Sequence, residues 1–353
     1  MKKNEEGLKE EKPTVGYGGG VLPAGIKVPS PDELICYLKD IDHPEGEYVP
    51  VSKAKIYATD FGLQLGVVAH DALRTINKTK LFRYEDHVER LCNSLRYLCL
   101  DPGLATGYKA NAEEVGKIWQ QICNRNAHLL GEHQELEPET WITLGRTRSL
   151  PHVMYAYDYP LIPATFINPA IIELSLFANW YKTGTNVCSA RSRMPTAQCI
   201  EQKVKCAARF PNYMAGMETS HLAIEGYPTF TLMLDNYGNL GELTAANIFI
   251  VSKGKVLTPR PTNILSGISR KCVIEACEGL GIQVIEQDLT IYDLINADEA
   301  FQTASSYCMF PIAGVDGKVL WKDVPGPITK RIMDKYSKGM GIEAFYEIDY
   351  KKH

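Results

Sequence analysis

Two stretches, K-V-K-C-A-A-R at residues 203–209 and D-N-Y-G-N-L-G-E-L-T-A-A-N-I-F-I-V at residues 235–251, decide how this chain is organised. The apolar and β-branched run just before the second stretch, residues 229–234, predicts a buried strand. The second stretch then supplies turn residues and a further apolar strand. Glu242 therefore lies just after a hairpin turn, where a solvated acid at a strand end is the commoner outcome.

The hairpin is followed by N-I-L-S-G-I-S-R at residues 263–270 and by a segment whose apolar residues have helical spacing. The start of a helix offers free N–H groups and the positive end of the helix dipole, which suits a phosphate group. An ordinary helix capped by serine is the alternative interpretation of this segment.

Seven motifs, taken in order, resemble the fold-type IV enzymes that depend on pyridoxal phosphate (PLP), the class IV aminotransferases. The resemblance covers about residues 48–336, and its family includes branched-chain aminotransferases, D-amino-acid aminotransferases and (R)-selective amine transaminases. The last motif, and Lys205 placed ahead of M-E-T (217–219), are most similar to the (R)-selective enzymes. The motifs are F-G-L-Q-L-G-V-V-A-H-D-A-L-R (61–74), L-F-R-Y-E-D-H-V-E-R-L (81–91), V-K (204–205), G-N-L-G-E-L-T-A-A-N-I-F (238–249), L-S-G-I-S-R (265–270), A-D-E-A-F-Q-T-A-S-S (297–306) and V-P-G-P-I-T (324–329).

The resemblance implies that Lys205 is the Schiff-base lysine and that Glu242 is the carboxylate paired with the pyridine nitrogen of PLP. Such a lysine moves protons, so its pKa must be lowered by burial or by nearby positive charge. Lys203 is a competing candidate, because it lies two residues earlier in a predicted strand and could share a face with Lys205.

The phosphate of PLP has four further residues assigned to it by the same resemblance. Arg90 is expected to grip the phosphate with a bidentate guanidinium, a geometry that lysine cannot match. Ile268 and Ser269 are expected to bind it at the start of their helix, and Ser305 supplies another hydroxyl. The alternative for Arg90 is a surface charge paired with Asp86, four residues earlier on a helix predicted over residues 85–98.

The substrate pocket is less well defined by the sequence. His70 stands where the family usually has tyrosine or phenylalanine, which makes the expected pocket more polar. Arg148, at the end of a strand predicted over residues 141–148, could meet a substrate carboxylate, although a solvated strand end is an equal alternative. No tyrosine falls at the family position that binds the O3′ oxygen of PLP, and this partner is left unassigned.

The composition limits the remaining possibilities. The 353 residues are 45% hydrophobic and carry a formal net charge of −4, which allows a sizeable core and gives no basic stripe for a nucleic acid. No apolar run is long enough to span a membrane. Ten cysteines without a C-x-x-C pair favour reduced thiols in a cytoplasmic protein, and no metal site is expected.

We therefore expect an α+β, two-domain fold of type IV. Residues 1–30 are expected to form a mobile arm, residues 31–165 an N-terminal α/β domain and residues 166–353 the C-terminal PLP-binding domain. The resemblance implies a homodimer that transfers an amino group from an amino acid or primary amine to a keto acid or ketone. A PLP-dependent lyase of the aminodeoxychorismate type and a non-catalytic PLP-binding protein are the alternatives.

Overall fold

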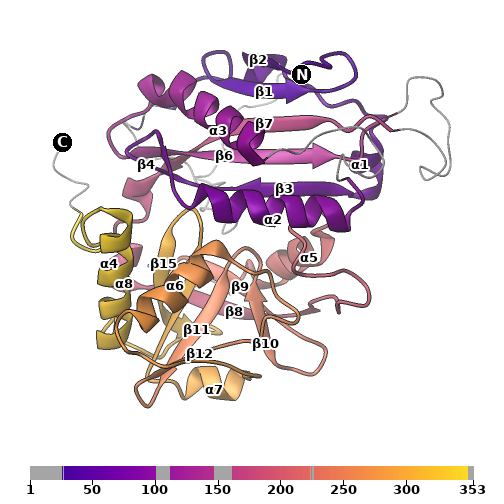
Figure 1. Cartoon of the computed structure of the whole chain (residues 1–353). Helices are drawn as coiled ribbons and strands as arrows, with labels where there is room; N and C mark the ends of the chain where they lie inside the picture. Colours follow the sequence, from indigo (N-terminus) through magenta and orange to yellow (C-terminus); the bar gives the residue numbers. More distant parts are fainter. Residues whose placement is uncertain are drawn as a thin grey trace, which may run out of the picture.

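The computed structural model places the chain in two units, each built around one sheet (Figure 1). Arg148 and nearly all of the expected N-terminal arm lie outside the part that the structure describes. The described residues are 26, 28–100, 112–146, 161–222, 224 and 226–348.

The first unit contains a five-stranded antiparallel sheet in the order β2-β1-β7-β6-β3, and β3 is one of its two edges. Helices α2 and α3 cover one face of this sheet, and their apolar residues pack on it around Leu91 and Trp119. The strands are β1 (Ile35–Lys39), β2 (Glu47–Pro50), β3 (Val68–Ala72), β6 (Gln134–Thr143) and β7 (Thr165–Glu173). The helices of this unit are η1 (Val51–Lys53), α1 (Phe61–Leu65), α2 (Tyr84–Tyr97), α3 (Ala112–Asn126) and η3 (Ala127–Leu129).

Strand β6 has two faces of different character, because successive side chains of a strand point to opposite sides. Leu136 and Ile142 are fully buried in the cores beneath the helices. The alternate positions Glu137, Glu139 and Trp141 lie on the other face and are only half-buried. The sheet therefore turns a row of polar side chains away from its own helices.

The boundary expected after residue 165 is wrong, because β7 belongs to the first sheet. It lies between β1 and β6, and its pairing with β6 runs from Ile142↔Thr165 to Gln134↔Glu173. Strand β7 forms backbone hydrogen bonds with a first-unit strand on each side, so it is an interior strand of the first sheet and cannot be the first strand of the second unit. The chain crosses to the second sheet only after Glu173.

The second unit is a nine-stranded mixed sheet in the order β10-β9-β8-β15-β14-β11-β12-β13, with β16 paired to β15. Its core holds Phe249, Phe301 and Phe310, all fully buried, with α6 and α8 packed beside it. The strands are β8 (Thr185–Arg193), β9 (Thr229–Leu234), β10 (Leu240–Leu243), β11 (Asn247–Ser252), β12 (Lys255–Thr258), β13 (Val284–Glu286), β14 (Glu299–Ala304), β15 (Cys308–Val315) and β16 (Lys318–Val319).

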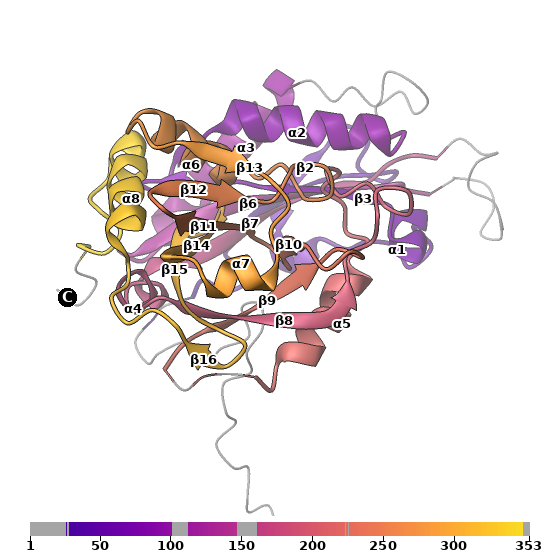
Figure 2. The ribbon, with the colours of Figure 1, turned by 90° about the horizontal axis from the view of Figure 1, so that it is seen from below.

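Figure 2 shows α5 and α8 at opposite ends of this second unit. Within the described ranges, no helix is long and apolar enough to cross a membrane. The helices of the second unit and of the crossing segment are η5 (Leu174–Leu176), α4 (Trp180–Thr183), α5 (Phe210–Thr219), α6 (Ile268–Glu278), α7 (Ile291–Ile295) and α8 (Pro327–Met340).

The sequence predictions for β9, β11 and the helix at α2 are confirmed within one residue at each end. Asn77 and Lys78, both at positive φ, form the turn between β4 (Thr75–Ile76) and β5 (Lys80–Leu81). Strand β3 pairs with β6 and not with this hairpin. The strand predicted over residues 141–148 begins earlier and ends at Thr143.

Candidate active site

Lys205 lies in the loop between β8 and α5, and not in the strand that the sequence suggested. This loop pairs with the free edge of β3: His70 N–H donates to the Lys205 carbonyl at 2.9 Å, and Ala207 N–H donates to the Val68 carbonyl at 3.0 Å. The Lys205 N–H donates to Ser94 Oγ of α2 at 3.1 Å. The backbone of Lys205 is therefore held by the first unit although its loop connects elements of the second.

The environment of Lys205 differs from that of Lys203. The Lys203 side chain is exposed, whereas Lys205 is partly buried. Burial, followed by the charges of Arg209 and Arg90, lowers the pKa of Lys205 to about 7. A lysine whose pKa is near neutrality has an appreciable fraction of neutral amine, which is the nucleophilic and basic form. The structure therefore favours Lys205 over Lys203.

Glu242 is buried in β10, with 8% of its surface exposed, and is not a solvated strand end. Its Oε2 accepts hydrogen bonds from the Leu265 N–H at 2.9 Å and from Asn247 Nδ2 at 3.1 Å. Burial raises the pKa of Glu242 to about 7, against the opposing effect of the Leu265 hydrogen bond and of nearby cations. A carboxylate buried in this way needs a positively charged partner to stabilise its ionised form.

The strand that carries Glu242 can take its position only because the preceding residue is glycine. A Cβ at Gly241 would lie 2.1 Å from Met194 Sδ and 2.9 Å from the Met233 carbonyl oxygen. Any larger residue would push β10 away from β9 and would move Glu242 with it.

The start of α6 lies beside Glu242. Gly267 is the N-cap residue, and a Cβ there would lie 2.1 Å from Asn247 Oδ1. Asn247 Nδ2 also donates to the Leu265 carbonyl at 3.1 Å, so this amide connects Glu242 to the loop before the helix. Ile268 and Ser269 form the first turn, whose N–H groups have no partner within the helix. The Ser269 hydroxyl accepts from Tyr336 at 3.2 Å and keeps its own proton to donate.

Arg90 is 9% exposed and points toward the same loop, where its Nη1 donates to the Ser266 carbonyl at 3.4 Å. Its Nε and Nη2 donate to the two oxygens of Asp71, each at 2.8 Å. The alternative pairing with Asp86 is wrong, because Asp86 binds Arg83 and Lys271 instead. Arg90 is therefore a buried guanidinium that is fixed by a carboxylate and lies next to the start of α6.

Asp71 is held in the ionised form by its neighbours. His87 Nδ1 lies 2.8 Å from Asp71 Oδ1, on the same oxygen that Arg90 Nη2 contacts. Burial alone would raise the pKa of Asp71, but Arg90 and His87 together bring it well below its usual range. Neither Asp71 nor His87 was singled out from the sequence; His87 lies in the same motif as Arg90, but the contact of both residues with Asp71 is visible only in the fold.

Ser305 lies in the turn between β14 and β15. The pairing of β11 with β14 places Asn247, which donates to Glu242, opposite Thr303. The turn that carries Ser305 therefore follows the end of β14 that pairs with Asn247. The next residue, Ser306, donates from its Oγ to Glu137 Oε1 at 2.8 Å and accepts from Arg74 Nη1 at its carbonyl at 3.2 Å. The turn is therefore tied to the polar face of β6.

His70 and Trp141 lie side by side on that polar face. Their rings stack with centroids 4.4 Å apart, and His70 Nε2 lies 2.9 Å from Glu139 Oε1. Burial, followed by the opposing hydrogen bond to Glu139, leaves the pKa of His70 lowered, so the ring is neutral at pH 7. Of the two predicted substrate residues, His70 is thus next to the lysine loop, and Arg148 lies outside the described residues.

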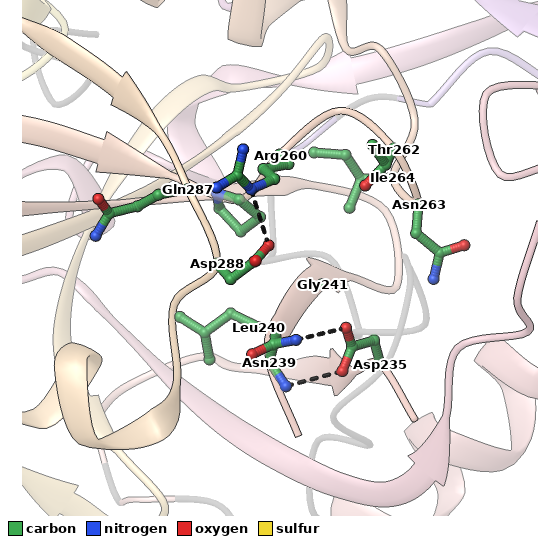
Figure 3. A pocket seen from close by; sticks show the side chains of 11 residues that line it. Asp235, Asn239, Leu240, Gly241, Arg260, Thr262, Asn263, Ile264, Gln287 and Asp288 are labelled. Atoms are coloured by element: carbon green, nitrogen blue, oxygen red, sulfur yellow. Dashed lines mark hydrogen bonds and ion pairs between the residues drawn. The ribbon is translucent and has the colours of Figure 1, made fainter. Parts of the chain in front are cut away.

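A hollow of about 390 Å³ separates the lysine loop from Glu242. Its wall includes Cys206 beside the lysine, Glu242, Leu265 and Arg209. A second hollow contains none of the predicted site residues. Figure 3 shows two pairs among its polar side chains, Arg260 with Asp288 and Asn239 with Asp235.

Arg209 is a residue of the site that the sequence interpretation missed. Its Nε donates to the Cys206 carbonyl at 3.2 Å and its Nη1 to the Thr244 carbonyl at 3.3 Å, so it bridges the lysine loop and the turn after Glu242. Its charge affects the pKa of both Lys205 and Glu242. The only available signal was its position four residues after Lys205. Tyr213, the tyrosine next along the chain, is 63% exposed and does not face this site.

Comparison with known proteins supports the resemblance seen in the sequence. The model of the family described as amino-transferase class IV matches residues 70–315. The chain is 34% identical over 289 residues to the D-alanine aminotransferase of Bacillus licheniformis, covering 81% of this chain and 92% of that protein. It is 25% identical over 333 residues to branched-chain-amino-acid aminotransferase-like protein 2 of Arabidopsis thaliana, which covers 92% of this chain but only 55% of that protein.

The fold agrees with these relationships. The branched-chain aminotransferase of Thermoproteus uzoniensis, solved with norvaline, superimposes with a TM-score of 0.71 at 27% identity and covers 89% of this chain and 97% of its own. The expected α+β, two-domain fold is confirmed. With a family model that spans more than half of its length, the chain belongs to the class IV aminotransferase family.

Proposed function

We propose that this protein is a PLP-dependent aminotransferase, which moves an amino group from an amino acid or primary amine to a keto acid or ketone. The observation that carries the proposal is Lys205, a lysine whose pKa of about 7 makes it both nucleophile and base, and whose charge acts on the buried Glu242. Relatives named as branched-chain and D-alanine aminotransferases support the same reaction.

The polar groups around the hollow fit the three reactive parts of PLP. Arg90 and the first turn of α6 offer donors to a phosphate, and the Ser305 turn lies near them. Glu242 offers a buried carboxylate to a protonated pyridine nitrogen, and that positive charge would counteract the rise in the pKa of Glu242 that burial causes. Lys205 offers an amine to the aldehyde. When bound, PLP supplies the electron sink for the reaction.

The chain's own residues then have separate tasks. Lys205 Nζ would serve as the base that takes up and releases the proton of the substrate carbon, because its neutral form is populated at pH 7. His70 and Ser94 fix the lysine backbone, so the amine works from one position. Arg209 keeps positive charge beside both Lys205 and Glu242, which favours the neutral amine and the ionised carboxylate.

The α5 helix supports pairing of two copies of the chain. Its exposed apolar side chains Phe210, Tyr213, Met214 and Met217, here called the α5 patch, follow the three-to-four-residue spacing of one helix face. Exposed apolar faces of this kind mark interaction sites. We expect light scattering to give twice 39.4 kDa for the protein and a smaller mass for Met217→Glu. A wild-type mass of one chain would contradict the homodimer.

The ten cysteines, all free thiols in the structure, support a reducing compartment and hence a cytoplasmic location. Most of them are buried, and burial raises the pKa of Cys36, Cys123, Cys272 and Cys277, so these thiols resist ionisation. Imaging of the tagged protein in its source cell tests the location.

The first test of the activity is the visible absorption of the purified protein with added PLP, before and after single additions of L-amino acids, D-amino acids and (R)-amines. Bleaching of the bound-cofactor band by one class, and its recovery with a keto acid, is the expected result. Release of pyruvate without any amino acceptor would favour the lyase, and a band that no donor changes would favour the non-catalytic protein.

The lysine assignment has a matched pair of variants. Lys205→Ala should lower turnover by a factor of about 10³ or more, because nucleophile and base are lost together. Lys203→Ala removes an exposed lysine two residues away and should change turnover less than twofold. Full activity in Lys205→Ala would reject the assignment.

A further inference from the structure

The polar face of β6 presents two carboxylates to the lysine loop. Glu137 and Glu139 are two residues apart on one face of the strand, the face opposite to the α2 and α3 helices. His70, from the neighbouring strand β3, lies on the same face, since it is paired with Trp141 and stacks on it. We call Glu137, Glu139, His70 and Trp141 the β6 wall.

Glu139 is joined to the lysine loop through a single residue. Its Oε1 lies 2.9 Å from His70 Nε2, and the His70 N–H donates to the Lys205 carbonyl at 2.9 Å. The Glu139 side chain is 29% exposed and the His70 side chain 13%, so both reach the open space beside the loop. The positive charge of Lys205 acts on both carboxylates and works to lower the pKa of Glu139 and of Glu137.

Glu137 marks the other end of the wall. Its Oε1 accepts from Ser306 Oγ at 2.8 Å, directly after the candidate phosphate-binding residue Ser305. Burial and the repulsion of Glu139 raise the pKa of Glu137. The wall therefore runs from His70, beside the lysine loop, to the turn after β14 that carries Ser305. Lys205 and Ser305 are proposed to hold two ends of the cofactor, so a substrate joined to it would lie near this wall.

The charge of this wall is not compensated by its hydrogen-bond partners. Among the described residues, the partners of the two carboxylates are the Ser306 hydroxyl, the neutral His70 ring and Trp141. Arg74 attracts Glu137 from a distance, but its guanidinium donates to the carbonyls of Thr75 and Ser306. Arg90 is paired with Asp71.

An aliphatic substrate side chain on this wall would remove water from two carboxylates without replacing its hydrogen bonds, and such desolvation is costly. A side chain that ends in an ammonium or guanidinium group would instead donate to them in charge-assisted hydrogen bonds. The difference favours a donor with a second positive charge, set apart from the amine that reacts.

We infer that the amino donor of this enzyme is a diamine or a basic amino acid, whose distal cation binds Glu139 and Glu137 of the β6 wall. The inference rests on the proposed aminotransferase activity and gives it a substrate class. Glu139 and Glu137 act here as specificity residues, because they contact the distal group and not the reacting carbon.

The test compares donors of matched length on the PLP-loaded protein. The pairs are lysine with norleucine, in both L and D forms, and cadaverine with pentylamine. The rate of cofactor bleaching gives kcat/KM for each half-reaction. We expect the cationic member of at least one pair to exceed its apolar partner by about tenfold or more. Equal values, or a preference for the apolar member, would overturn the inference.

Two variants tie that preference to the wall. Glu139→Gln and Glu137→Gln keep the size and hydrogen bonds of each side chain but remove its charge, and each should reduce the cation-to-apolar ratio by roughly threefold to tenfold while apolar donors keep their rates. Glu89→Gln, an exposed glutamate of α2 on the opposite side of the sheet, is the matched control and should leave the ratio unchanged. A preference that survives both wall variants would also overturn the inference.

A binding measurement separates failure of the wall from failure of the proposed function. Titration calorimetry with cadaverine, run on the same PLP-loaded proteins, needs no turnover. If no donor bleaches the cofactor but cadaverine still binds more weakly to Glu139→Gln, the aminotransferase proposal fails and the cation site stands. If donors react but cadaverine binds wild type and Glu139→Gln equally, the activity stands and the cation site fails.

Discussion

Two acidic regions flank the loop that carries Lys205, and they differ in what neutralises them. Asp71 is fully buried and is paired with Arg90 and His87 inside the protein. Glu137 and Glu139 are half-buried and have uncharged partners. The first region is complete without a ligand and serves to hold Arg90 in place. The second forms no ion pair with a lysine or arginine among the described residues, although the charge of Lys205 acts on both carboxylates, and we propose a cationic substrate group as its direct partner.

Replacing Asp71 gives the largest expected effect on stability. Asp71→Asn leaves the Arg90 guanidinium buried without a counter-charge, and breaking a buried ion pair in this way costs about 3–5 kcal/mol. Urea unfolding of the apoprotein measures the change in the free energy of unfolding. Bound phosphate on Arg90 would compensate part of the charge, so the loss should be smaller in the PLP-loaded protein.

Asp86→Asn is the matched control, since Asp86 also contacts an arginine and a second cation from its place on α2. Its partners Arg83 and Lys271 are more exposed, and pairs near the surface contribute only about 0–1 kcal/mol. If Asp71→Asn costs no more than Asp86→Asn, the buried region is not a structural support, and the contrast with the β6 wall disappears.

The cofactor side of the site could be predicted because its chemistry demands particular residue types within short motifs. Lys205, Glu242 and the Ile268-Ser269 pair each lie in such a motif, and in the structure Glu242 lines one hollow with both neighbours of Lys205 in the chain and with Leu265 of the loop before α6. The boundary at residue 165 failed because β7 is continuous with the chain that enters the second unit, and only its pairing with β1 and β6 assigns it to the first.

The β6 wall could not be predicted for a different reason. Its residues lie on β3 and β6, and Ser306 contacts it from the turn after β14. These segments are far apart in the chain, and cross-strand register decides whether they meet. Alternating glutamates along a strand ordinarily indicate a solvated face. The loop that carries Lys205 pairs with the edge of β3, and this pairing brings the loop next to the polar face. No local sequence pattern predicts that contact.

The pH dependence of stability extends the comparison to Glu242, a buried carboxylate whose proposed partner, the pyridine nitrogen of PLP, is absent from the apoprotein. Its pKa of about 7 in the folded state lies above the ordinary glutamate value of 4.5. Between these values the folded protein binds a proton that the unfolded chain has released, so its stability falls as pH rises. The penalty is complete above pH 7 and absent below about pH 4.5.

Glu242→Gln removes this penalty while keeping an acceptor for the Leu265 N–H. The stability of the apo variant relative to wild type should therefore increase by roughly 2 kcal/mol between pH 5 and pH 8. Lys205 titrates in both proteins, so the difference isolates Glu242. A difference that is constant over this range would mean that Glu242 is ionised throughout and already has a cationic partner, as Asp71 does.

Arg209 provides the smallest and most specific test, because it lies between the lysine loop and Glu242 without belonging to either acidic region. Its charge lowers the pKa of Lys205. Arg209→Gln should therefore raise the pH at which Lys205 reacts, and the rate of PLP capture by the apoprotein at pH 7 should fall by roughly threefold to tenfold. The pH profile of the capture rate, followed at the cofactor band, gives the midpoint directly.

Arg331→Gln, an exposed arginine on α8, controls for the change in net charge and should leave the midpoint in place. A lower rate in Arg209→Gln with an unchanged midpoint would assign Arg209 a role in positioning the loop through the Cys206 and Thr244 carbonyls. A midpoint that moves up would instead show that charge acts on Lys205 directly. Glu139→Gln should move the midpoint in the opposite direction, because it removes a negative charge that stabilises the Lys205 ammonium group.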